Sequence, residues 1–334
     1  MTQLIAETAW HHEGDIGFMR DLVGKLCEGS QADVIKMHIT LDLDSYMTQD
    51  HEAYNTLKKW MLREEEWCEL VAAVEKSNKK LMLLLNDNRA IEFASKFKPD
   101  FVELHSVCLN VPRLQECLLK NIDPITPIMI GVGGCTLEEI DSAISVFRDR
   151  QTILMFGFQN YPTKYEDVNL RKIRKIQSLY SENKFGYADH TAWDEPNNEL
   201  INLLVASNGM DFVEKHVTTE YGVERCDYSA AVSISMLNQL ADKLKILDGL
   251  KGNGEIGLHE GERIYSQYGP MKMAAIAKKS ISVGSILGEG DIEFIRTASV
   301  TKMSQTDIVR GIGKTVKKII NKGQILDWSH FEGS

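Results

Sequence analysis

Residues 81–106 read LMLLLNDNRAIEFASKFKPDFVELHS and contain two short apolar runs, LMLLLN (81–86) and FVELHS (101–106). Each run has the length and composition of a buried β-strand, and the segment between them is long enough for a helix. Similar runs lie on both sides of this stretch, at 4–9, 34–40, 127–133, 152–160, 184–189 and 211–218. Such a repeated unit of strand and helix is typical of a parallel sheet with helical crossovers.

The segments between the strands support the same interpretation. Amphipathic stretches with apolar residues at helical spacing cover 18–27, 64–77, 137–147 and 168–180. Strand and helix alternate eight times before the pattern changes. We therefore predict an α/β fold in which a (β/α)8 TIM barrel is followed by a small β-rich domain.

The pattern changes after a helix expected at 236–250. The segment GLKGNGEIGLHEGE (249–262) is rich in glycine, which predicts a flexible linker. Beyond it KKSISVGSIL (278–287) is repeated as KKIINKGQIL (317–326), which indicates a small β-rich domain of two related hairpin-like units. We predict a catalytic barrel at 1–250, a linker at 251–272 and a small domain at 273–334.

The composition excludes several classes of partner. Lysine and arginine number 38 against 48 aspartates and glutamates, a net charge of −10, which disfavours nucleic acid and anionic membranes as partners. No run of eighteen apolar residues and no basic leader is present, so we expect no membrane span and no export signal. The six cysteines form no C-x-x-C pair, which favours a reducing, cytoplasmic location.

Ionisable residues gather where the predicted strands end, which is where barrel enzymes carry their catalytic groups. On three strands they alternate and share one face: Lys36 with His38, Glu103 with His105, and Glu214 with His216. Lys215 points the other way, Glu7 lies on the first strand, and the sixth and seventh strands end in Asn160, Tyr161, Asp189 and His190. Since an unpaired buried charge costs about several kcal/mol, the set predicts a polar site. Ion pairing or solvation at the barrel mouth is the alternative for any single residue.

Two of these residues suggest a metal site. His190 and His216 end neighbouring strands, whose backbones run about 4.8 Å apart, so both imidazoles can reach one ion. Imidazole ligands suit Mn²⁺, Fe²⁺ or Zn²⁺ better than Mg²⁺. Asp189 or Glu214 could orient the ligands or complete the shell. A histidine satisfied within the core is the alternative.

The segment GVGGCTLEE (131–139) joins the fifth strand to a helix that Thr136 opens, with Glu139 at capping-box spacing. Backbone N–H groups of Gly133 and Gly134 at this helix start could hold a phosphate. A tight turn is the alternative. The segment DLDSYMTQDHEAYN (42–55) is long enough for a lid or specificity loop, or for a solvated excursion.

Five motifs together resemble the N-acetylneuraminate (sialic acid) synthase family. They are IAETAWHHEGD (5–15), PIMIGVGGCTLEEI (127–140), NYPTKYEDVNL (160–170), FGYADHT (185–191) and FVEKH (212–216). The C-terminal segments IAKKSISVGSILGEGDIEFIR (276–296) and IGKTVKKIINKGQIL (312–326) resemble the antifreeze-like (SAF) domain of that family. The resemblance extends from about residue 3 to the end.

The resemblance implies a metal-dependent condensation of phosphoenolpyruvate with the open-chain aldehyde of an N-acetylated hexosamine. The products are a 2-keto-3-deoxy (nonulosonic) acid and phosphate. His190 and His216 match the metal ligands, with Mn²⁺ the expected ion and Mg²⁺, Fe²⁺, Zn²⁺ or Co²⁺ as alternatives. Glu7 and Glu214 match the carboxylates that contact the acceptor and move protons.

Further positions follow from the same resemblance. Lys36, Tyr161 and Asp189 match family positions at the catalytic site, and Ser106 matches a substrate contact. The family forms a domain-swapped homodimer in which an arginine of the SAF domain reaches the partner's site. Arg296, in DIEFIR, stands in that place.

Other positions depart from the family pattern. Glu103 replaces a lysine, Gly131 and Ala188 replace serines, and His11 and His12 stand where the family has N-H. Gly157, Phe158 and Gln159 replace a C-T-S segment, and Ile295, Arg296 and Thr297 replace K-R-P. When a glutamate replaces a lysine beside a phosphate, attraction becomes repulsion. The change in interaction energy is on the order of several kcal/mol at an effective dielectric constant near 20.

These departures leave three alternatives open. The GVGG backbone, with Arg89, His38 and His105, could form an altered phosphate site. The donor could instead be pyruvate or another keto acid, in a metal-dependent aldolase or lyase reaction. The chain could also be a non-catalytic sugar-binding or assembly partner of a true synthase.

Overall fold

The computed structural model describes residues 1–157 and 160–331, and it divides the chain into two compact units, Met1–Gly252 and Asn253–Ser334. The end of the strand predicted at 152–160 falls partly on Phe158 and Gln159, which lie outside the described residues. Each unit has its own buried apolar cluster.

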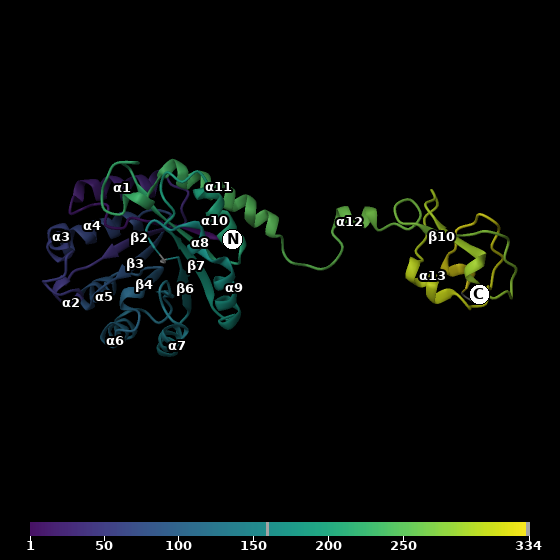
Figure 1. Cartoon of the computed structure of the whole chain (residues 1–334), viewed down its shortest axis with the longest axis horizontal. Coiled ribbons are helices and arrows are strands. Elements are labelled where there is room, and N and C mark those ends of the chain that lie inside the picture. The colour runs from purple at the N-terminus through teal and green to yellow at the C-terminus, as the bar shows by residue number, and fades with distance from the viewer. Residues whose placement is uncertain (158–159, 332–334) are drawn as a thin grey trace. The chain divides into compact units, whose positions relative to one another are not determined.

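Eight parallel strands form the centre of the first unit (Figure 1). They are β1 (Gln3–Glu7), β2 (Val34–Ile39), β3 (Lys80–Leu85), β4 (Phe101–Leu104), β5 (Ile128–Gly131), β6 (Thr152–Phe156), β7 (Lys184–Asp189) and β8 (Phe212–Thr218). Because β1 pairs with both β2 and β8, the sheet closes into a barrel. The predicted (β/α)8 barrel is therefore confirmed. In its register, Glu7 lies opposite both Lys36 and His216.

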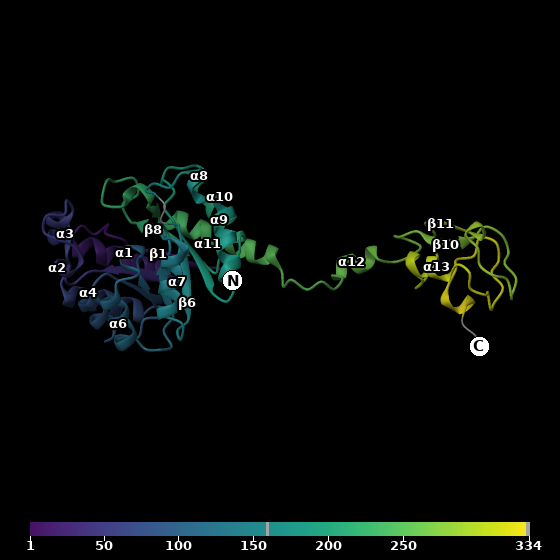
Figure 2. The same cartoon turned by 60° about the horizontal axis from the view of Figure 1, so that its bottom comes forward.

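Helices cover the outside of the barrel, and α10 packs against α11 there (Figure 2). In chain order the helical segments are α1 (Ile16–Gly29), α2 (Leu43–Tyr46), α3 (Tyr54–Trp60), α4 (Glu64–Glu75), α5 (Asn88–Ala94), the 3-10 turn η1 (Ser106–Cys108), α6 (Pro112–Asn121), α7 (Leu137–Val146), α8 (Tyr165–Val168), α9 (Leu170–Leu179), α10 (Asn198–Ser207), η2 (Tyr228–Ala230) and α11 (Ile234–Lys251). A short strand β9 (Val232–Ser233) pairs with the end of β8. Outward-facing strand residues such as Ile35, Leu83 and Leu104 are fully buried against these helices.

Several predicted elements end earlier or are interrupted. The strands predicted at 101–106 and 127–133 stop at Leu104 and Gly131, because Ser106 begins a 3-10 turn and Gly134 has a positive φ of 78°. The helix predicted at 168–180 is interrupted at Asn169, which has a left-handed φ of 45°. Asparagine tolerates this conformation, and its side chain caps α9 by accepting the N–H of Lys172.

The interior of the barrel has two layers. The lower layer is apolar and closes the barrel at the amino ends of the strands: Ile5, Val34, Met82, Phe101, Met129, Ile153, Met155 and Phe212. Two residues further along β1, β2, β4 and β8 the inward positions are Glu7, Lys36, Glu103 and Glu214, all buried. The apolar layer therefore supports a polar layer at the carboxyl ends, where the sequence predicts the site.

The second unit is built around its internal repeat. Its elements are α12 (Glu260–Tyr265), β10 (Ala274–Ala277), η3 (Glu289–Asp291), β11 (Ile292–Ile295), α13 (Gln305–Gly311) and η4 (Trp328–His330). Ile281 and Ile320 occupy equivalent positions of the repeat and exchange both backbone hydrogen bonds, at 2.8 and 3.0 Å. The sequence suggested two hairpin-like units. The two copies instead pair with each other. Helix α12 also lies within the segment predicted as a linker.

Two expectations about the whole chain can be compared with the structure. None of the described helices has the length and apolar character needed to span a bilayer. All six cysteines are free thiols, of which Cys108 is buried.

Candidate active site at the carboxyl end of the barrel

A cavity of 360 Å³ opens at the carboxyl ends of the barrel strands. Ten residues predicted for the site line it: Glu7, Lys36, His38, Glu103, His105, Ser106, Tyr161, His190, Glu214 and His216. Gly131 and Ala188, two of the departures from the family pattern, also line it. The alternation of side chains along the strands therefore correctly predicted that Lys36, Glu103 and Glu214 point to the inside of the barrel.

One lysine and three glutamates form the floor of the cavity. Lys36 Nζ lies 3.0 Å from Glu7 Oε2, 2.8 Å from Glu103 Oε2 and 3.0 Å from Glu214 Oε1. All four side chains are at most 5% exposed. Each comes from an inward position of a different strand, so closure of the barrel brings them together. If all four were ionised, this buried cluster would carry a net charge of −2.

Protonation relieves part of that charge. Burial raises the pKa of Glu214 to about 8, and burial also raises the pKa of Glu7, in both cases against the attraction of Lys36. Burial opposes the charge of Lys36, yet Glu103, Glu214 and Glu7 together raise its pKa well above the ordinary value. At neutral pH the cluster therefore holds a charged lysine and a protonated Glu214, which is a proton donor at the floor of the cavity.

A group of rings lies at the rim. His190 and His216 are in edge contact, with ring centres 4.9 Å apart and planes at 81°. Tyr161 lies 5.5 Å from the ring of His190, and its hydroxyl donates to the carbonyl of Asp227. Burial lowers the pKa of His190 to about 4 and that of His216 well below the ordinary value. Both imidazoles are thus neutral at neutral pH, the form that binds metals.

The two histidines fit the donor type that a transition-metal ion requires, but the site is not preassembled. In the described part of the chain, no three His, Cys, Asp or Glu side chains are already arranged to hold an ion. Metal binding would therefore need reorientation of rings, additional ligands from substrate or water, or both.

Asp189 does not join the cavity, contrary to the prediction. Its side chain points outward from β7, where its Oδ2 accepts from Lys215 Nζ at 2.6 Å and from Asn202 of α10 at 2.9 Å. Both charged side chains are completely buried. Burial opposes ionisation of Asp189, but Lys215 and the hydrogen bonds lower its pKa overall. The pair joins β7 and β8 at the residues that directly precede His190 and His216.

The predicted phosphate loop also lies elsewhere. Gly133 and Gly134 border a separate hollow of 180 Å³ near α9. The start of α7 is occupied by its own capping box, in which Thr136 N–H donates to Glu139 at 2.7 Å and Thr136 Oγ1 accepts the Glu139 N–H at 3.2 Å. These interactions leave fewer backbone donors for an anion.

Two arginines considered from the sequence have other partners. Arg89 is exposed, lies 3.9 Å from Glu64 and does not line the cavity. Arg296 belongs to the second unit, where its guanidinium donates to the carbonyl of Pro270 at 2.9 and 2.6 Å. Within the described residues that line the cavity, Lys36 is the only lysine or arginine.

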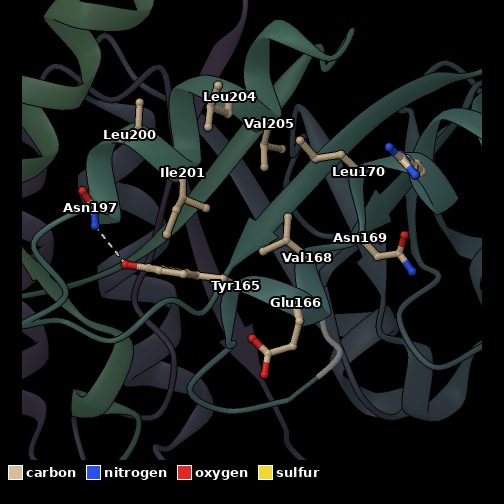
Figure 3. A pocket seen from close by; sticks show the side chains of 11 residues that line it. Tyr165, Glu166, Val168, Asn169, Leu170, Asn197, Leu200, Ile201, Leu204 and Val205 are labelled. Carbon is tan, nitrogen blue, oxygen red and sulfur yellow. Dashed lines mark hydrogen bonds between the residues drawn. The ribbon is translucent and has the colours of Figure 1, made fainter.

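A larger hollow of 530 Å³ lies outside the barrel, between α8, α9 and α10 (Figure 3). Val168, Leu200 and Ile201 point into it, and the hydroxyl of Tyr165 is hydrogen-bonded to Asn197 at its edge, 2.9 Å away. Its lining is largely apolar and carries no histidine or cysteine. Since the barrel cavity, and not this hollow, holds the buried Lys36 cluster and the two histidines, the barrel cavity is the candidate active site.

Comparison with known proteins assigns the chain to a family. Residues 30–256 match the NeuB family, which is more than half of the chain. The chain belongs to the NeuB family. It is 25% identical to N,N'-diacetyllegionaminic acid synthase of Legionella pneumophila, over 98% of this chain and 94% of that protein. It is 22% identical to human N-acetylneuraminate-9-phosphate synthase, over 94% of this chain and 88% of that protein.

A solved NeuB-like structure supports the fold. The sialic acid synthetase of Leptospira borgpetersenii, crystallised with citrate, superposes with a TM-score of 0.71 at 22% identity. The match covers 79% of this chain and 89% of that protein. This superposition supports the barrel architecture of the chain.

Several residues of the cavity were not predicted. Trp10, Tyr46, Met155, Phe156 and Asp227 also line it, together with Ala9, Leu84 and Val107. Tyr46 lies in the segment 42–55, which the sequence marked as a possible lid or specificity loop. Trp10 and Asp227 lie in connecting loops, and Met155 and Phe156 carry apolar side chains, so the alternation of ionisable residues along the strands did not identify them. His11 packs beside His216, with ring centres 5.8 Å apart, and was noted only as a departure from the family motif.

Proposed function

We propose that this NeuB family member is a sugar acid synthase that joins an enolpyruvate donor to the open-chain aldehyde of an N-acetylated amino sugar. Phosphoenolpyruvate is the first donor considered, with water as co-reactant and phosphate and a 2-keto-3-deoxy acid as products. The observation that carries the proposal is the neutral pair His190 and His216 beside the Lys36 carboxylate cluster. The names of the related synthases support this chemistry.

The residues at the rim fit a divalent cation. His190 and His216 would hold it, since both are neutral and their rings are in contact. When bound, the cation supplies Lewis-acid polarisation of the aldehyde oxygen. We take Mn²⁺ as the first ion to test, with Fe²⁺, Co²⁺, Zn²⁺ and Mg²⁺ as alternatives.

The floor of the cavity supplies proton transfer. Glu214 keeps its proton up to about pH 8 and can donate it to the oxygen that gains negative charge when the carbon–carbon bond forms. Glu7 is fixed by the Ala9 N–H at 2.8 Å and by Lys36 at 3.0 Å. This orientation allows it to accept a hydrogen bond from an acceptor hydroxyl. Lys36 offsets the charge that forms between them.

The ion pair between Glu103 and Lys36 supports a second candidate donor. Its 2.8 Å contact occupies the one lysine of the cavity, so a phosphoryl dianion would approach three carboxyl groups and an already paired cation. A keto acid such as pyruvate carries a single carboxylate and meets less repulsion. The second candidate is therefore a metal-assisted aldol or lyase reaction with pyruvate or a related keto acid.

One assay separates the two candidates. Full-length protein is treated with chelator, reloaded with Mn²⁺, and incubated with N-acetylmannosamine and either phosphoenolpyruvate or pyruvate. Equal release of phosphate and 2-keto-3-deoxy acid is expected with phosphoenolpyruvate. Consumption of pyruvate without phosphate release would support the second candidate. Sugar binding by calorimetry without turnover of either donor would contradict both and support a binding role.

The assembly prediction adds to this proposal. We propose that the second unit, as the antifreeze-like domain of a domain-swapped homodimer, places Arg296 near the partner's cavity. This arrangement would add a second cationic side chain to a cavity whose described lining has Lys36 as its one lysine or arginine. Comparison of Arg296→Ala with Arg310→Ala, a change at another arginine of the same unit, tests it through the KM for the donor.

A further inference from the structure

His11 is a buried histidine that the proposed chemistry leaves unused. It follows β1 in the loop before α1, and its side chain is 0% exposed. Its Nδ1 lies 2.6 Å from the carbonyl oxygen of Cys226, so this nitrogen carries the proton and donates it. Its Nε2 is buried and has no hydrogen-bond partner in the part of the chain that the structure describes. An unsatisfied buried acceptor costs about 1–3 kcal/mol, which a ligand at that nitrogen would offset.

The ring of His11 lies against the two histidines of the rim. Its centre is 5.8 Å from that of His216, with the planes at 87°. His216 is in turn 4.9 Å from His190, at 81°. Imidazoles that share one ion at metal–nitrogen distances of about 2.0–2.1 Å have ring centres roughly 5 Å apart. The separations of 5.8 and 4.9 Å are both close to this value.

Two of the three rings have a backbone carbonyl behind them, as metal ligands commonly do. A histidine that binds a metal usually donates its other ring N–H to a carbonyl or carboxylate. His11 donates through Nδ1 to Cys226 O, and His190 Nδ1 lies 3.5 Å from Gly157 O. His216 has a buried Nδ1 without a partner among the described residues. Two buried, unsatisfied imidazole nitrogens thus lie on adjacent rings.

We infer that His11 is a third imidazole ligand of the metal ion, which gives a set of His11, His190 and His216. The inference rests on the proposed function, which places the ion at the latter two residues. Where the sialic acid synthase motif has asparagine, this chain carries an imidazole. Three imidazoles favour Zn²⁺, Co²⁺ or Fe²⁺ over Mn²⁺, because nitrogen ligands suit these ions better. Open positions on the ion remain for the substrate.

The first test measures metal affinity in the full chain. Chelator-treated protein is titrated with Co²⁺, and binding is followed by visible absorption. We expect His11→Asn to bind Co²⁺ at least about tenfold more weakly than the wild type and to show a changed spectrum. His12→Asn is the matched control, because His12 packs beside Trp67 and accepts the Gly14 N–H at 3.0 Å. Its affinity should equal that of the wild type, and an unchanged affinity of His11→Asn would overturn the inference.

The second test does not depend on any variant. X-ray absorption at the zinc edge of wild-type protein loaded with one equivalent of Zn²⁺ counts the imidazole ligands. Three imidazoles are expected. Two imidazoles would overturn the role of His11 and leave the proposed metal site at His190 and His216 intact. Failure of the wild type to bind any divalent ion would instead contradict the metal site of the proposed function, and His11 would lose its role with it.

Discussion

Glu103 Oε2 lies 2.8 Å from Lys36 Nζ, the shortest of the three carboxylate contacts that this lysine makes. Where the sialic acid synthase motif has a lysine, this chain has a carboxylate that pairs with Lys36. The exchange of lysine for glutamate makes the net charge of the buried cluster more negative. In the proposed reaction, the choice of donor depends on this contact.

The first prediction concerns Glu103→Gln. The amide keeps the shape of the side chain and removes one negative charge from the cavity floor. If phosphoenolpyruvate is the donor, its KM should fall by about tenfold, equivalent to about 1.4 kcal/mol less repulsion. Glu92→Gln, at an exposed carboxylate of α5, is the control and should leave KM unchanged. An unchanged or higher KM in Glu103→Gln would argue that the phosphoryl group does not approach Glu103.

The second prediction is a pH dependence set by Glu214. Since burial raises its pKa to about 8, the proton-donating form predominates below that pH and is lost above it. We expect kcat to fall as the pH rises through about 8, by about tenfold per unit in the limit. Glu214→Gln should lower kcat by about 10²–10⁴-fold and remove this alkaline limb. A limb that persists unchanged in the variant would assign it to another group.

The third prediction concerns His216→Ala. This substitution removes one of the two imidazoles of the proposed metal site, and with it the ring that contacts His190. Calorimetric titration of the full chain with Mn²⁺ should show no binding in this variant. His259→Ala, at an exposed histidine of the second unit, should bind as the wild type does. Wild-type affinity in His216→Ala would remove this residue from the ligand set.

The alternation of side chains explains which site residues the sequence could predict. Lys36, Glu103 and Glu214 lie within strands, where a period of two fixes the direction of each side chain. The same rule accounts for the error at Asp189. Ala188 and His190 face the cavity, so Asp189 between them faces outward to Lys215. The prediction came from the place of Asp189 at the end of the seventh strand and from the family resemblance, and it did not apply this alternation.

Loop residues were harder to predict for a physical reason. His11 and Gly133 follow strand ends, where no period fixes the side chain or the turn. The contact of His11 with His216 depends on closure of the barrel between β1 and β8. The predicted barrel already implies that the first and eighth strands pair, but it does not fix where the loop after the first strand places the His11 ring, so only the structure brings these rings together.

The fourth prediction tests the buried ion pair behind the site. Asp189→Asn leaves Lys215 buried without a charged partner, which should destabilise the barrel by about 3–5 kcal/mol. The change in the free energy of unfolding is measured by denaturant titration, from the transition that reports unfolding of the barrel. Asp21→Asn breaks an exposed pair with Lys25, whose Nζ lies 2.7 Å away, and should cost at most about 1 kcal/mol. Equal effects of the two variants would contradict a structural role for Asp189.

The fifth prediction concerns Gly131, which stands where the family motif has a serine. A Cβ at this position would lie 2.7 Å from the backbone nitrogen of Ser106, closer than packing allows. Gly131→Ser should therefore shift the start of η1 and destabilise the barrel by about 1–3 kcal/mol. Gly24→Ala in α1 meets no atom within 4 Å and should stabilise the same transition by about 0.5–1 kcal/mol. The two substitutions should thus change the free energy of unfolding in opposite directions. A Gly131→Ser variant that is as stable as the wild type and has the same KM for the donor would show that η1 can move to accommodate the serine.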